Sequence, residues 1–64
     1  MTVRIVYRTF TGYAEQAWTE FTDAEMKAAD VKSLAEKKLF DMIRRDRVTE
    51  IIGVYNDDAN TRIA

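Results

Sequence analysis

The stretch TVRIVYRTFTGYAEQAWTEF, residues 2–21, decides the fold of this 64-residue chain. Its first part, residues 2–10, is rich in β-branched and aromatic side chains with a period of two, which predicts a β-strand. Residues 13–21 also alternate and predict a second strand. Because Thr11 and Gly12 lie between the two, the sequence indicates a β-hairpin.

The length of the hairpin loop determines which residues pair. A two-residue Thr11-Gly12 loop would pair Ile5 with Trp18 and mix an apolar side with a polar side. A three-residue loop, with Gly12 in the left-handed region, pairs Ile5 with Ala17 and keeps the two sides separate. We therefore expect the second register. Its apolar face carries Val3, Ile5, Tyr7, Tyr13, Ala17 and Phe21, and its other face carries Arg4, Val6, Arg8, Ala14, Gln16, Trp18 and Glu20.

A helix is expected between residues 22 and 46, but its start is ambiguous. Three patterns could begin it, namely Thr22-x-x-Glu25, Asp30-x-x-Ser33 and Ser33-x-x-Glu36. One helix over residues 23–46 would be about 36 Å long, against about 30 Å for a nine-residue strand. We therefore expect a turn or short helical segment at 23–29 and a main helix over about residues 30–46. The apolar stripe of that helix is Val31, Leu34, Ala35, Leu39, Met42 and Ile43.

Residues 48–55, VTEIIGVY, predict a third strand, and residues 56–64 form a polar tail. The tail begins with a turn at 56–60 and is then either frayed or a short strand at 61–63. The predicted fold is a small α+β single domain of order ββαβ. A three-stranded antiparallel sheet, order 2-1-3, carries one helix on one face and leaves the other face uncovered.

Composition excludes several kinds of chemistry. The chain has no cysteine and no histidine, so disulfides, Cys/His zinc sites, thiol nucleophiles and imidazole proton transfer are all excluded. Asn56-x-Asp58-x-Asn60 resembles the start of an EF-hand loop, but Thr61 stands where that loop needs glycine. We expect no enzymatic activity, no metal and no cofactor. Short apolar runs and an N-terminus without a signal-peptide core predict a cytoplasmic protein with no membrane contact.

The uncovered sheet face is the predicted interaction surface. A chain of this length has a small core, so a partner, including a second copy, would add stability, and we expect a homodimer. Trp, Tyr and Arg side chains on an exposed face have the composition of an interface hot spot. The predicted surface consists of Arg4, Val6, Arg8, Trp18, Ile51 and Tyr55.

The charges of the chain suggest an alternative, nucleic-acid or nucleotide binding. Acids outnumber bases by six to two over residues 15–36, whereas bases outnumber acids by five to two over residues 37–47. Arg44, Arg45 and Arg47 form the basic cluster of this alternative, which would also use the sheet aromatics. The sequence pI of about 5.3 and the acids that interrupt the cluster, Asp41 and Asp46, count against it.

The sequence therefore favours a small, non-enzymatic protein–protein interaction module. Cysteine-free single domains of this length are typical of inhibitors and adaptors, including those that phages make against host proteins. This comparison rests on size and type alone. The identity of the protein partner is not encoded in any motif of the chain.

Overall fold

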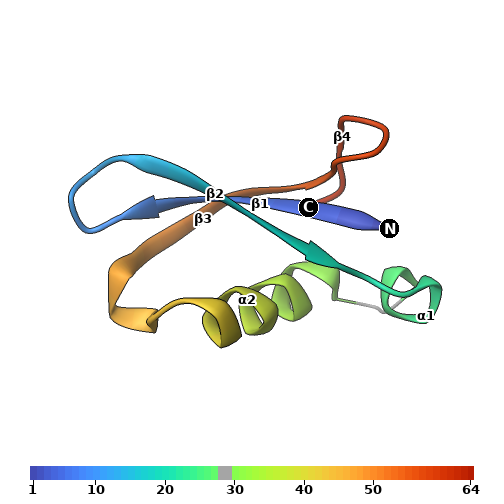
Figure 1. Cartoon of the computed structure of the whole chain (residues 1–64), viewed down its shortest axis with the longest axis horizontal. Helices are drawn as coiled ribbons and strands as arrows, with labels where there is room; N and C mark the ends of the chain where they lie inside the picture. Colours follow the sequence, from blue (N-terminus) through green and yellow to red (C-terminus); the bar gives the residue numbers. More distant parts are fainter. Residues whose placement is uncertain (28–29) are drawn as a thin grey trace.

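The computed structural model describes residues 1–27 and 30–64. Its elements form one antiparallel sheet in the order β2-β1-β3-β4, with helix α2 lying along one face (Figure 1). The predicted small α+β fold is confirmed, but the sheet has four strands instead of three. In chain order the elements are β1 (Thr2–Thr9), β2 (Ala14–Glu20), α1 (Asp23–Met26), α2 (Val31–Met42), the 3-10 turn η1 (Arg45–Arg47), β3 (Val48–Asn56) and β4 (Thr61–Arg62).

The β1–β2 hairpin has the predicted three-residue loop. Ile5 pairs with Ala17, and no register shift interrupts the two strands. The Thr9 N–H donates to the Tyr13 carbonyl at 2.9 Å, and the Gly12 N–H donates to the Thr9 carbonyl at 2.9 Å. Gly12 has φ +92°, a conformation that a residue without Cβ adopts readily. The register predicted from the alternation pattern is thus confirmed.

Two of the three helix-start signals are used, each by a different helix. Thr22 and Glu25 form a capping box at α1, in which each side chain accepts from the backbone N–H of the other. Asp30 caps α2 by accepting from the Ser33 N–H at 3.0 Å. Ser33 itself lies inside α2, so its own start signal is not used. These backbone hydrogen bonds lower the pKa values of both carboxyl groups, Glu25 and Asp30.

Helix α2 ends at Met42, four residues before the predicted end at residue 46. Ile43 is already extended, with φ −133° and ψ 161°. A helix that continued to residue 46 would leave only Arg47 to reverse the chain before β3, whereas residues 43–47 make this connection here. Met42 is consequently 46% exposed and outside the core. Phe40 packs against the core instead.

The core lies between the sheet and α2. Its side chains come from β1, from Phe21 directly after β2, from α2 and from β3, and each is removed almost completely from water. Burial of one large aliphatic side chain contributes about 1.5–3 kcal/mol. The buried hydrophobic residues are Val3, Ile5, Tyr7, Phe21, Ala35, Leu39 and Val54.

Lys38 fastens α2 to two other elements. Its Nζ lies 3.0 Å from a Glu25 carboxylate oxygen of α1. The same ammonium donates to the Glu20 carbonyl at the end of β2, at 3.2 Å. It also lies 5.0 Å from the centre of the Phe21 ring, within cation–π range. One side chain therefore joins the two helices to the sheet.

The predicted polar tail is ordered and adds the fourth strand. Asn56 accepts hydrogen bonds from the backbone N–H groups of Asp58 and Ala59, which confirms the predicted turn. β4 then pairs with the end of β3. Ile63 and Ala64 pack against the core, so burial of apolar surface holds the tail in place.

Candidate functional site

The sheet face opposite α2, called the open face below, is defined by the strand registers. Val3, Ile5 and Tyr7 of β1 are buried towards the helix, so the residues between them point the other way. Pairing across the sheet then assigns the neighbouring strands. The open face contains Arg4, Val6, Arg8, Gln16, Trp18, Glu50 and Tyr55.

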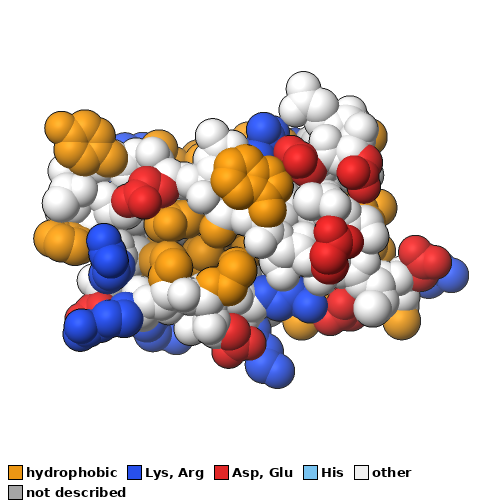
Figure 2. All heavy atoms as spheres, viewed as in Figure 1, with side chains coloured by type: hydrophobic (Ala, Val, Ile, Leu, Met, Phe, Trp, Pro, Cys, Tyr) orange, Lys and Arg blue, Asp and Glu red, His pale blue; other side chains and the backbone are white. Residues whose placement is uncertain are grey.

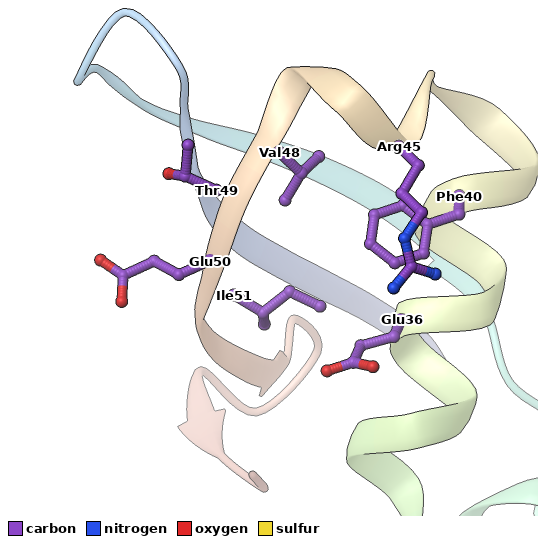
Figure 3. A pocket seen from close by; sticks show the side chains of 7 residues that line it. All are labelled: Glu36, Phe40, Arg45, Val48, Thr49, Glu50 and Ile51. Atoms are coloured by element: carbon purple, nitrogen blue, oxygen red, sulfur yellow. The ribbon is translucent and has the colours of Figure 1, made fainter.

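Ile51 is not on the open face, and its predicted place there is wrong. Val6 pairs with Gly53, but the next residue of β1, Tyr7, pairs with Ile51. Ile52 is therefore an extra residue, a β-bulge that reverses the alternation of β3. Ile51 packs against the core. Figure 3 shows Ile51 and Val48 pointing towards Phe40 of α2, where they line a hollow of about 220 Å³ together with Glu36 and Arg45.

Glu50 occupies the open face in place of Ile51. The Arg8 Nε donates to a Glu50 carboxylate oxygen at 2.9 Å, across paired residues of β1 and β3. The Arg8 Nη1 also donates to the Gly12 carbonyl at 3.1 Å. The sequence analysis missed Glu50, although Gly53 was an available signal, since an isolated glycine in a strand pattern often marks a bulge.

Trp18 is the most exposed apolar side chain of the open face, with 53% of its surface accessible. It stands directly across from Arg4, which in turn stands directly across from Tyr55. The three side chains thus form one row over β2, β1 and β3. The pairing of Arg4 with Trp18 is the one predicted from the hairpin register.

Arg4 is held firmly in the middle of this row. Its guanidinium carbon lies 5.0 Å from the centre of the Tyr55 ring. Its Nη2 donates to the Asn60 side-chain oxygen at 3.2 Å, and its Nε lies 3.9 Å from an Asp57 carboxylate oxygen. Arg4 therefore joins the β3–β4 turn to the sheet, although its buried Nε has no hydrogen-bond partner among the described residues.

Tyr55 is fixed by the absence of a side chain at Gly53. A Cβ atom placed on Gly53 would lie 2.9 Å from Tyr55 Cε2 and 3.0 Å from its hydroxyl oxygen. The Tyr55 ring therefore covers Gly53, and the Arg4 guanidinium lies over the ring. A side chain at residue 53 would displace the Tyr55 ring, which covers the backbone that glycine exposes.

The basic cluster lies at the other end of the molecule, in the connection between α2 and β3. Arg44 pairs with Asp46 at 2.9 Å, and the Arg45 guanidinium lies 5.0 Å from the Phe40 ring centre. Arg44, Arg47, Asp46 and the exposed Phe10 line an open hollow of about 480 Å³. Figure 2 shows Lys and Arg side chains gathered at this end. The cluster is thus separate from the row formed by Trp18, Arg4 and Tyr55.

No family of known proteins, no characterised protein and no solved structure matches this chain. Over the described residues, 1–27 and 30–64, the helices are too short and too polar to cross a bilayer. Inference about function therefore rests on the surface described above.

Proposed function

We propose that this chain is a small, non-enzymatic interaction module of the cytoplasm that binds another protein through its open face and thereby inhibits or modulates it. A phage-type inhibitor of a host protein is the class of molecule that fits its size. The observation that carries the proposal is the half-exposed Trp18 beside a fixed arginine and tyrosine. Trp, Tyr and Arg are the residues most enriched in interface hot spots.

The rigidity of the row supports this role. Binding costs less when the anchoring side chains are already ordered. Arg4 is held by Tyr55 and Asn60, and Tyr55 is seated on Gly53. Trp18 can then insert into a partner's pocket without reorganisation of its neighbours.

The composition supports a binding role over catalysis. With no histidine and no cysteine, the chain lacks the usual groups for proton transfer and nucleophilic attack near neutral pH. On the open face, Arg8 pairs with Glu50 across neighbouring strands. Such pairs fix orientation and specificity at an interface.

The test compares Trp18→Ala with Tyr13→Ala. Tyr13 is the matched control because it is a 75% exposed aromatic residue directly before β2, the strand that contains Trp18. Each variant and the wild-type chain are immobilised and offered to a lysate of the native host, and captured proteins are identified by mass spectrometry and then titrated. We expect Trp18→Ala to weaken binding by about 2 kcal/mol or more and Tyr13→Ala to leave it unchanged. Equal binding by both variants, with unchanged circular dichroism, would contradict the proposal.

A second candidate function is nucleotide or nucleic-acid binding at the basic cluster. It is favoured by the hollow that Phe10, Arg44 and Arg47 share, since an aromatic ring beside arginines suits base stacking near phosphate. The dependence of binding on salt concentration distinguishes the two functions. Phosphate recognition weakens steeply between about 50 and 200 mM salt, whereas binding through the Trp18 row should change little. A double variant, Arg44→Ala with Arg47→Ala, would abolish phosphate recognition and leave binding through the Trp18 row intact.

A further inference from the structure

We infer that the free edge of β2 is the contact between two copies of this chain, joined as antiparallel β2 strands so that two sheets become one. The inference deepens the homodimer expected from the sequence, and it does not depend on the identity of any other partner. β2 forms one edge of the sheet and pairs only with β1 among the described strands. Unlike β3, it is a regular strand with no bulge.

The hydrogen-bond pattern shows which backbone groups are free. The Thr9 N–H donates to the Tyr13 carbonyl, Met1 and Phe21 donate to each other's carbonyls, and hydrogen-bonded pairs alternate along an antiparallel ladder. The odd-numbered residues of β2 therefore bond to β1, and the even-numbered ones point their N–H and C=O groups outward. Lys38 occupies the outward carbonyl of Glu20. Over residues 1–27 and 30–64, the backbone groups of Ala14, Gln16 and Trp18 have no comparable partner.

Edge strands in stable monomers are usually protected by bulges, prolines, charged side chains or a covering loop. β2 has the sequence AEQAWTE, with no bulge, proline or lysine, and its charged residues are Glu15 and Glu20. The strand lies at the front of the molecule in Figure 1. Figure 2 shows hydrophobic side chains exposed below this edge, in the space between the sheet and α2. The edge therefore offers both backbone hydrogen bonds and apolar surface to a second strand.

A second copy fits this edge in one register better than in others. Pairing Gln16 with Trp18 of the second copy sets the symmetry axis at Ala17 and aligns all seven residues of β2, with the Glu20 carbonyl at each end already bonded to Lys38. Each Glu15 then faces a Thr19, whose hydroxyl can donate to the carboxylate. The two Glu15 residues lie four residues apart, about 13 Å along the strand, where salt screens their repulsion. The two acids of β2 thus never face each other.

In this register, the open faces of the two copies lie next to each other on the same side of the combined sheet. Trp18 of each copy becomes a diagonal neighbour of the other, at a distance of about 7–8 Å that aromatic side chains can span. At the axis, the two Ala17 residues form a pair that is not hydrogen-bonded, where Cα atoms approach to about 4.5 Å.

The absence of cysteine from the chain allows a direct test of both the edge and the register. We would compare Ala17→Cys with Ala14→Cys, a matched alanine on the same strand, under mild oxidation at equal concentration. In the paired strands, the two thiols of Ala17→Cys would lie within disulfide range, whereas those of Ala14→Cys would be about 20 Å apart. We expect Ala17→Cys to form the cross-linked dimer at least about tenfold faster, because its thiols are held together.

A second variant and one measurement on the wild type complete the test. Gln16→Pro removes an outward N–H that the chain itself does not use, a place where edge strands tolerate proline. We expect it to keep its circular dichroism and to run as a monomer in light scattering at a concentration where the wild type is a dimer. Equal cross-linking rates for the two cysteine variants, or a dimeric Gln16→Pro chain, would overturn the inference. If the wild type is still a dimer in that case, the homodimer stands and another surface forms it. A monomeric wild type would overturn both the β2 contact and the homodimer.

Discussion

The two faces of the sheet are built from the same strands but are stabilised in different ways. On the covered face, Val3, Ile5 and Val54 are fully buried against α2, and apolar contact holds them. On the open face, Arg4 and Arg8 are held by directional contacts, and Trp18 keeps half of its surface in water. The covered face therefore determines whether the chain folds, whereas the open face leaves an aromatic side chain exposed to solvent.

The largest expected effect is on the covered face. Leu39→Ala removes a fully buried side chain of α2 and should lower the free energy of unfolding by about 2–5 kcal/mol, measured by urea denaturation. Met42→Ala is the control, since this side chain is 46% exposed and should cost less than about 1 kcal/mol. Similar losses for the two variants would show that α2 does not end where we describe it.

A smaller loss of stability is expected at Gly53, where the Tyr55 ring leaves no room for a side chain on the open face. Gly53→Ala places a methyl group against the Tyr55 ring, and overpacking of this kind costs about 1–3 kcal/mol. Adding Tyr55→Ala should remove the clash, so the double variant should lose less stability than the sum of the two single variants. Additive losses in thermal denaturation would mean that the ring is not seated on Gly53.

The centre of the open face should tolerate change somewhat better. Arg4→Ala removes the hydrogen bond to Asn60 and the contact with Tyr55, and together these contribute about 1–2 kcal/mol. Arg4→Lys keeps the charge but not the planar donor group, so an intermediate loss is expected. If Arg4→Ala has full stability in chemical denaturation, the β3–β4 turn does not depend on this side chain.

The smallest expected effect is a loss of stability at acid pH, caused by the carboxyl groups at the N-termini of α1 and α2. The folded-state pKa values of Glu25 and Asp30 lie below their ordinary values of 4.5 and 3.8, because backbone N–H groups stabilise the carboxylates. Their contribution is therefore complete above those ordinary values and is lost as the pH falls through the lowered ones. The melting temperature should fall slightly below about pH 4.5.

Glu25→Gln with Asp30→Asn provides the control for this acid effect. The amides still accept hydrogen bonds at the two caps but do not titrate, so the melting temperature of this variant should change less between pH 6 and about pH 3. An unchanged pH profile would assign the acid sensitivity to other carboxylates.

The sequence predicted those features that depend on local pattern. The alternation of residues 2–21, together with Gly12, was sufficient for the hairpin register and for the places of Trp18 and Arg4. Both helix caps were also visible as spaced polar pairs. Each of these depends on residues close together in the chain, so local chemistry determines it.

The features that sequence reasoning missed depend on contacts between distant elements. The bulge at Ile52 is visible only once β3 is aligned with β1, and it exchanges Ile51 for Glu50 on the open face. The end of α2 at Met42 reflects the distance that residues 43–47 must cover to reach β3. The fourth strand forms because Ile63 and Ala64 find apolar surface to cover.

The contacts of Lys38 give the chain a built-in chemical reporter. Its amine is engaged by Glu25 and by the Glu20 carbonyl, whereas its neighbour Lys37 is exposed. An amine-reactive label should therefore modify Lys37 quickly and Lys38 slowly while α2 is docked on the sheet. In a peptide that contains both lysines, the fragment ions that separate residue 37 from residue 38 would give the ratio of the two modifications and so measure helix docking without any substitution.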